Sequence, residues 1–497
     1  MDYFAITPIH GAIKADRQGA KRHYGVHPYF TRRPQNVVRE HILHFTQPGD
    51  TVLDPFGGSG VTAIEALFSN RIGIQNDINP LANFIADGIA DLRFLDLNDL
   101  GTAFDSVLCR YDTTMRGNLE QVKVHIGNHL PEDIDLPKTS DVRSYRELFT
   151  NEQLVELALL RSLIEEVDND HSKSALMLAW SATLSKINRT FISAKGRAAS
   201  RGGSSIFSIY RYKIAGEPVI LNTRAIFCER FNNIVAAKTE IDQLIRFQQE
   251  SGGKFIGQYQ SFNFDVLSLP DRIPGKVDYI FTDPPYGGHI AYLDLSTLWN
   301  VWLGKEPSSD ERAREIIVGG MAGISEDEYT TRLSQSITAC CAMLNRDRWL
   351  SVVFQHSEPK YFAAILDAAA EAGAELRSAV TQVGDTIWSM HKKKNGEGVL
   401  GGEFILTFYN SGKLQRGLPR VQFDVSDWLS KAISSNGERV YAEEILNGLI
   451  LEAWKRGSLD SLSISKEELN SILTGKGLQY DASLHCWRRG LAQANLF

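Results

Sequence analysis

The sequence predicts an α/β protein in which a doubly wound parallel sheet is interrupted by a large, mainly helical insertion and followed by a small helical domain. Short β-rich runs alternate with helical runs in the first 95 residues, stop, and resume from residue 258 to about residue 410. Such alternation is typical of a parallel sheet with helices on both faces. A chain of 497 residues is long enough for several such parts.

The first part of the sheet domain is expected in residues 1–95. Thr51 to Leu53 forms a short β-rich run, and a glycine turn separates it from a helical run at Val61 to Ser69. Arg71 to Gln75 is predicted as the second strand and Leu81 to Ile89 as the helix after it. The order strand, loop, helix therefore occurs twice.

Residues 96–255 are predicted to be the insertion, with target recognition as its candidate role. Apolar residues recur at helical spacing in residues 151–166, 175–187 and 224–249. The strand pattern returns only after these runs. We therefore expect a helical segment between the second and third strands of the sheet.

The middle of this insertion carries uncompensated positive charge. From His171 to Gly216 the sequence contains eight Lys or Arg residues and no Asp or Glu. Such a stretch is typical of phosphate contacts, although a solvated helical surface is the alternative. The candidate nucleic-acid-binding residues are Lys186, Arg189, Lys195, Arg197 and Arg201.

The second part of the sheet domain is expected in residues 256–415. Strands are predicted at residues 258–266, 277–282, 349–355, 376–382 and 403–409, with helices at 326–344 and 359–372, which brings the total to seven strands. Residues 416–497 contain two amphipathic runs, at 442–454 and 466–473, and are predicted to form a small helical C-terminal domain of unknown role.

Composition narrows the class of protein. Hydrophobic residues make up 43% and charged residues 23%, as in ordinary globular proteins. The five cysteines lack CxxC spacing, so neither a disulfide framework nor a metal site is expected. The N-terminal residues show no basic segment followed by an apolar run, and no apolar stretch approaches membrane-spanning length. We expect a cytoplasmic protein without a membrane partner.

A glycine-rich loop lies between the first predicted strand and its helix. The loop runs from Asp54 to Gly60 as DPFGGSG, and its glycines permit a tight turn and close approach of a ligand to the helix N-terminus. Asp77 at the end of the second strand is placed to bind ribose hydroxyls, and Asp265 at the end of the third to accept from an adenine amino group. A structural β-to-α turn is the alternative, whereas the absence of Gly-Lys-Ser/Thr argues against a P-loop. The pattern favours a nucleotide-type cofactor site.

A second motif, Asp283-Pro284-Pro285-Tyr286, follows the predicted strand at residues 277–282. Two prolines fix the backbone and remove N–H groups, so the loop presents acceptors in set directions. Asp283 and the carbonyl of Pro284 could both accept from one amino group, while Tyr286 offers a ring on which a flipped base can stack. A proline turn that merely closes a strand is the alternative, but the predicted cofactor signature at the neighbouring strand ends favours catalysis.

These motifs resemble a known family. The run HPYFTRRP at residues 27–34 and the run PGDTVLDPFGGSG at residues 48–60 resemble the cofactor half of amino-group DNA methyltransferases, and Asp283 to Tyr286 resembles their catalytic loop. Residues 292–303, which begin YLDLS, are similar to a group of bacterial adenine-specific methylases. The resemblance covers residues 20–95 and 258–410.

The resemblance implies a seven-stranded Rossmann-like methyltransferase sheet that uses S-adenosyl-L-methionine and no metal. In this family's pattern Asp77 would contact the ribose, Asp265 the adenine, and the segment from Tyr29 to Thr31 the methionine part of the cofactor. The expected cofactor-binding residues are Tyr29, Thr31, Asp54, Phe56, Gly58, Gly60, Asp77 and Asp265, and the expected catalytic residues are Asp283, Pro284, Pro285 and Tyr286.

The predicted function is methylation of an exocyclic amino group in DNA. Adenine N6 is favoured because residue 283 is Asp rather than Ser, which resembles the adenine enzymes of this family. Cytosine N4, guanine N2 in RNA, and a non-catalytic nucleic-acid-binding subunit of the same fold are the alternatives. RNA is the less favoured polymer because no RNA-binding N-terminal domain is recognisable. The recognition sequence and the oligomeric state are not predicted, and a restriction or defence-system partner stays open.

Overall fold

A computed structural model gives the fold of the chain. It describes every residue except 1, 17–20, 118–121, 123–125, 194–201, 217–218, 251–252, 357, 383–402, 415–422, 436–438, 460–461, 463–465, 482–485 and 490–497.

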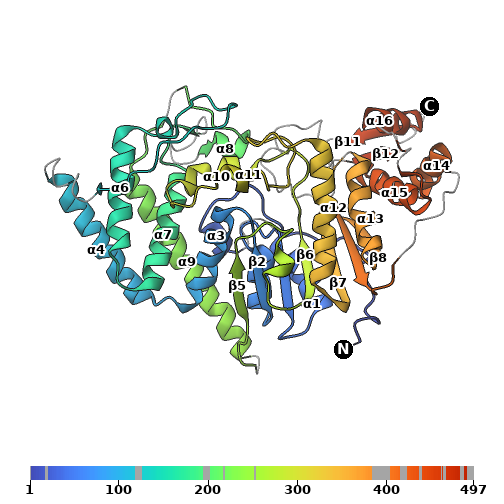
Figure 1. Cartoon of the computed structure of the whole chain (residues 1–497), viewed down its shortest axis with the longest axis horizontal. Helices are drawn as coiled ribbons and strands as arrows, with labels where there is room; N and C mark the ends of the chain where they lie inside the picture. The colour runs from blue at the N-terminus through green and yellow to red at the C-terminus, as the bar shows by residue number, and fades with distance from the viewer. Residues whose placement is uncertain are drawn as a thin grey trace, which may run out of the picture.

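The centre of the molecule is a seven-stranded sheet with the order β5-β2-β1-β6-β7-β9-β8 (Figure 1). The strands are β1 (Thr51–Asp54), β2 (Ile72–Asn76), β5 (Gln258–Phe262), β6 (Val277–Thr282), β7 (Leu344–Phe354), β8 (Ala374–Gln382) and β9 (Glu403–Asn410). The five strands from β5 to β7 pair in parallel, whereas β9 runs antiparallel to both of its neighbours. The predicted seven-stranded Rossmann-like sheet is therefore confirmed.

Helices cover both faces of this sheet, and the strand sequences explain why. Val52 of β1 and Tyr279 of β6 belong to one hydrophobic core, while Leu53 and Ile280, the next residues along, belong to the other. Side chains alternate between the faces of a strand, so both sets are buried only if both faces are covered. One face is covered by α1 (Gln35–Phe45), α2 (Val61–Phe68) and α3 (Pro80–Asp91), and the other by α12 (Glu326–Met343) and α13 (Pro359–Glu371).

The segment between α3 and β5 is mainly helical and packs beside the sheet. Its helices are α4 (Leu97–Arg116), α6 (Asn151–Glu165), α7 (Asp170–Leu184), α8 (Ser205–Ser208) and α9 (Thr223–Glu250), with a short hairpin of β3 (Phe191–Ser193) and β4 (Gly202–Ser204). Helix α7 contacts α3, α6 and α9 and lies among them in Figure 1. Trp180 of α7 lies in the same hydrophobic core as Val52 of β1, so this segment and the sheet share one core.

Two further helices, α10 (Tyr292–Asn300) and α11 (Ser309–Arg312), follow β6, and short 3-10 helices occur at His23–Gly25, Leu92–Phe94, Tyr145–Leu148 and Leu269–Asp271. Figure 1 shows α10 and α11 above the sheet, beyond the end at which β6 finishes. No helix within the described residues combines the length and apolar character needed to cross a bilayer.

The C-terminal segment is not wholly helical, unlike the prediction. Helices α14 (Val425–Ser435), α15 (Ala442–Lys455) and α16 (Lys466–Gly475) are joined by a three-stranded sheet of β10 (Arg439–Val440), β11 (Leu478–Asp481) and β12 (Cys486–Arg489), in the order β10-β12-β11. Helix α15 fixes this unit to β8 and α13, because Asn447 donates to Thr381 of β8 (3.0 Å) and Trp454 donates to Asp367 of α13 (2.8 Å). The strands have only two to four residues, which explains why periodicity did not reveal them.

Candidate cofactor pocket and catalytic loop

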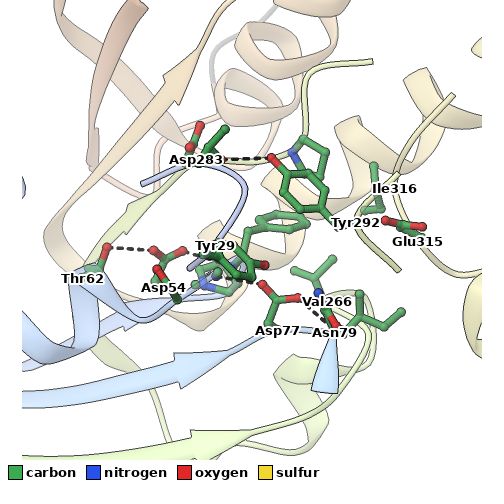
Figure 2. A pocket seen from close by; sticks show the side chains of 18 of the residues that line it. Tyr29, Asp54, Thr62, Asp77, Asn79, Val266, Asp283, Tyr292, Glu315 and Ile316 are labelled. Atoms are coloured by element: carbon green, nitrogen blue, oxygen red, sulfur yellow. Dashed lines mark hydrogen bonds between the residues drawn. The ribbon is translucent and has the colours of Figure 1, made fainter. Parts of the chain in front are cut away.

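A cavity with about 850 Å³ of empty space, including its open side, lies at the carboxyl ends of β1, β2 and β6. The carboxyl edge is where parallel α/β sheets bind ligands. Figure 2 shows Asp54 and Asp77 toward one end of the cavity and Asp283 toward the other. Of the predicted site residues, those that line it are Tyr29, Thr31, Asp54, Phe56, Gly58, Asp77, Asp265, Asp283 and Pro285.

The glycine loop turns from β1 into α2 through two left-handed residues. Gly58 has φ +51° and Gly60, the N-cap of α2, has φ +86°. Because the first N–H groups of a helix have no partner within it, this turn leaves the donors of α2 available near the cavity. Gly60 does not itself line the cavity, so its part is to shape the turn.

Asp77 joins this loop to the end of β2. Its carboxylate accepts the N–H of Gly58 and the N–H of Asn79, both at 2.8 Å. Enclosure by the protein raises its pKa to about 6, against the effect of these two donors. Each carboxylate oxygen retains a second acceptor site, which is what two ribose hydroxyls require.

Asp54 lines the cavity, but most of its acceptor sites are used by hydrogen bonds within the protein. Its two oxygens accept the hydroxyls of Thr62 (2.7 Å) and Thr282 (2.8 Å), and one also accepts the N–H of Phe56 (3.1 Å). Burial raises its pKa to about 7, and the three donors limit that rise. Asp54 thereby ties β1, α2 and β6 together directly beneath the cavity.

Asp265 reaches the cavity from a loop rather than from a strand. The third strand was expected to continue to residue 266, but β5 ends at Phe262. Asn76 holds the following loop, because its amide donates to the carbonyl of Phe264 and accepts the N–H of the same residue, each at 3.1 Å. These two side-chain hydrogen bonds hold the loop where the backbone hydrogen bonds between β2 and β5 have ended. No motif in the sequence indicated this role of Asn76.

Aromatic residues form the part of the cavity wall next to the glycine loop. The ring of Tyr29 lies so near Gly58 that a Cβ there would be 3.3 Å from it. Tyr292, the first residue of α10, stacks on Tyr29 with 6.4 Å between ring centroids, and its hydroxyl lies 3.3 Å from that of Thr31. In the sequence, Tyr292 stood out only as the first residue of the YLDLS run that is similar to bacterial adenine-specific methylases. In the structure it lines the cavity.

Asp283 to Tyr286 follow β6 directly, as predicted. The hydroxyl of Tyr286 donates to Asp283 at 2.5 Å, and its ring packs edge-on against Phe354 at 5.2 Å between centroids. Tyr329 donates to the carbonyl of Pro285 at 2.7 Å. The loop is thus held from β7, which pairs with β6, and from α12.

Sequence reasoning missed two charged residues at this loop. Arg33 donates to Asp283 and Tyr286 and also pairs with Glu403 at the start of β9. Arg33 lies inside the HPYFTRRP run, so its place in a family-like motif could have marked it as a site residue. Glu403 lies in no such motif.

Glu315, in the wall of the cavity, is a third charged residue that the sequence motifs did not indicate. Burial raises its pKa to about 8, and it accepts the N–H of Leu293 at 3.1 Å near the N-terminus of α10. It therefore also orients the helix that carries Tyr292.

The predicted nucleic-acid contacts are less free than the local sequence suggests. Lys186 pairs with Glu229 at 3.0 Å, and Arg189 donates to the carbonyl of Glu147 at 2.8 Å. Lys195, Arg197 and Arg201 lie outside the described residues. Acidic residues from other helices can thus neutralise a stretch that contains none itself.

The cavity fits the expected cofactor chemically. S-adenosyl-L-methionine presents ribose hydroxyls and an adenine amino group, which need acceptors, and a carboxylate, which needs N–H donors. The cavity offers the carboxylates of Asp77 and Asp265 as acceptors, the turn before α2 as a source of donors, and Phe56 as an apolar surface. When bound, such a cofactor supplies an electrophilic methyl group.

Comparison with known proteins agrees with this reading. The sequence model of a family described as DNA methylase matches residues 3–83, which include the glycine loop and Asp77. The Type II methyltransferase M.MvaI of Kocuria varians is 21% identical over 280 residues, a match that spans 54% of each chain, so the chain covers about half the length of this relative. No solved structure matches the chain. With the seven-stranded sheet, these matches confirm the resemblance to the amino-group DNA methyltransferases, a family whose methyl donor is S-adenosyl-L-methionine.

Proposed function

We propose that this protein is a DNA methyltransferase that transfers the methyl group of S-adenosyl-L-methionine to an exocyclic amino group, most favourably N6 of adenine. One observation carries the proposal: a cavity with acceptors for a nucleoside is lined by Asp283 and Pro285 of the DPPY loop, at the carboxyl edge of a methyltransferase-type sheet. The match to a family model described as DNA methylase supports DNA as the polymer.

In the proposed reaction the protein mainly binds and orients. Asp283 and the carbonyl of Pro284 accept from the amino group of an extruded base, and the ring of Tyr286 supports that base. Asp77 and Asp265 hold the nucleoside part of the cofactor at the other end of the cavity. The amino nitrogen then approaches the methyl group in line, and proximity and electrostatic placement account for most of the rate.

The preference for adenine over cytosine rests on the identity of residue 283, which is Asp. Both bases present an amino group that the loop could hold, and adenine is favoured by the family pattern alone. Cytosine N4 is the second candidate, because the geometry at Asp283 suits either base. A restriction or defence-system partner for this activity is part of the same proposal.

The direct test incubates the full chain with labelled S-adenosyl-L-methionine and either DNA or RNA, followed by nucleoside analysis. We expect label in N6-methyladenine from DNA, and at least about a hundredfold less transfer by Asp283→Ala. Label in N4-methylcytosine would select the second candidate. Transfer to neither polymer, with cofactor binding intact, would refute the enzymatic proposal.

A further inference from the structure

Three polar side chains converge on the guanidinium group of Arg33, and each meets a different nitrogen. Nε donates to one oxygen of Asp283 at 2.5 Å, Nη2 donates to the hydroxyl of Tyr286 at 2.9 Å, and Nη1 pairs with Glu403. The side chains of Arg33, Asp283 and Glu403 are 15%, 21% and 18% exposed. Arg33 comes from the segment before α1 and Glu403 from β9, so the cluster joins distant parts of the chain.

In this arrangement each carboxylate oxygen of Asp283 already accepts one hydrogen bond. Arg33 holds one oxygen and the hydroxyl of Tyr286 donates to the other at 2.5 Å. These are the atoms that the amino group of a target base would have to reach. An amino group that takes the site held by Nε of Arg33 would replace one N–H donor to Asp283 with another.

The charges explain why one cation is shared by two carboxylates. Burial and the negative charge of Glu403 raise the pKa of Asp283, whereas Arg33 and the Tyr286 hydroxyl lower it. Tyr292 of α10 and Asp54 at the end of β1 are the other ionisable groups whose charge is coupled to that of Asp283. Without Arg33, a buried Asp283 facing Glu403 would favour its protonated form, in which one oxygen carries a proton and the carboxyl group is a weaker acceptor for N–H donors.

Resting on the proposed function, we propose that Arg33 and Glu403 form a positioning pair for base capture. Arg33 keeps Asp283 ionised and correctly turned, and Glu403 keeps Arg33 in place when the amino group of the base takes over its contact with Asp283. Lysine could not replace Arg33, because a single ammonium cannot present three N–H groups in one plane to three partners. Arg33 and Glu403 are thus positioning residues that act through Asp283.

The test compares Arg33→Lys, Arg33→Gln and Glu403→Gln in the full chain, by methyl transfer to DNA across pH. We expect kcat to fall about tenfold to a hundredfold for Arg33→Lys. The acid limb of the pH–rate profile should move to higher pH in Arg33→Gln and to lower pH in Glu403→Gln, because the two substitutions change the pKa of Asp283 in opposite directions. A purely structural role would not produce opposite shifts.

A matched control lies at the other end of β6. Arg348 pairs with Asp278 at 3.1 Å, with side-chain exposures of 20% and 17%, remote from the cavity. Arg348→Lys should leave kcat and the acid limb unchanged. Calorimetric binding of S-adenosyl-L-methionine shows whether each variant is folded, and Glu403→Gln, which is nearly isosteric, tests the idea even if the Arg33 variants fail to fold.

The outcomes separate this inference from the proposed function. A wild-type chain that transfers no methyl group refutes the proposed function. A wild-type chain that transfers methyl groups, while Arg33→Lys retains full kcat or the acid limbs of Arg33→Gln and Glu403→Gln move in the same direction, refutes the positioning pair alone.

Discussion

Gly60 allows a quantitative test of how the glycine turn is built. Its φ of +86° is one that an L side chain rarely adopts, and an added Cβ would lie 2.5 Å from the Cβ of Ala86 in α3. The backbone strain of such a residue costs about 1–2 kcal/mol. Forcing an additional methyl group into a packed contact costs about 1–3 kcal/mol more. Gly60→Ala should therefore lose about 2–5 kcal/mol in free energy of unfolding.

Gly49 provides the matched control. It has φ +90°, and no described atom outside its own neighbourhood would lie within 4 Å of an added Cβ. Gly49→Ala should therefore show only the backbone term, about 1–2 kcal/mol. In addition, Gly60→Ala should weaken binding of S-adenosyl-L-methionine at least about tenfold by moving the start of α2, which corresponds to about 1.4 kcal/mol. Gly49→Ala should leave that affinity unchanged.

A double-mutant cycle with Ala86 isolates the steric part of the stability loss in Gly60→Ala. Removing the Cβ of Ala86 leaves its Cα, 3.2 Å from the added atom, as the nearest obstacle. Although Ala86→Gly alone costs about 1 kcal/mol in a helix, it should couple favourably with Gly60→Ala by more than about 0.5 kcal/mol. Urea denaturation gives the stabilities and calorimetry the affinities. Equal losses for the two glycine variants, with no coupling to Ala86, would refute the packing argument.

Three further predictions follow from buried charges. Asp77→Asn should weaken cofactor binding at least about tenfold. Calorimetry should show the cofactor affinity of the wild type falling as the pH drops through about 6, the pKa of Asp77, because the ionised carboxylate accepts the ribose hydroxyls. The same pH dependence in Asp77→Asn would contradict this role. Arg312→Met leaves Asp294 and Glu306 without their shared cation and should cost about 3–5 kcal/mol in urea denaturation; a loss below about 1 kcal/mol would exclude that role. Burial raises the pKa of Asp54 from 3.8 to about 7. The stability that Asp54 contributes to the wild type should therefore be lost as the pH rises from 4 to 7, and Asp54→Asn should gain up to about 4 kcal/mol relative to the wild type over that window. A stability difference between the two proteins that does not vary with pH would count against the raised pKa.

Local patterns in the sequence were enough for the sheet and for most of the cavity. The runs around β1, β2 and β6 alternate with helical runs, and a turn into α2 requires glycine at Gly58 and Gly60 whatever surrounds it. Parallel strands present their carboxyl ends at one edge, so Asp54, Asp77 and Asp283 were expected to gather there. Each of these inferences depends on residues that are close in sequence or on a general rule of strand order.

Only the tertiary structure decided how these groups are used. Arg33 meets Asp283 across 250 positions, Glu403 joins them from β9, and Glu229 neutralises Lys186 from another helix. Asp54 turned out to accept two hydroxyls and one N–H within the protein, and the C-terminal unit contains strands too short to leave a periodic signal. Charge pairing and burial depend on which surfaces the chain brings together, and those are set by long-range packing, not by the neighbours of a residue in sequence.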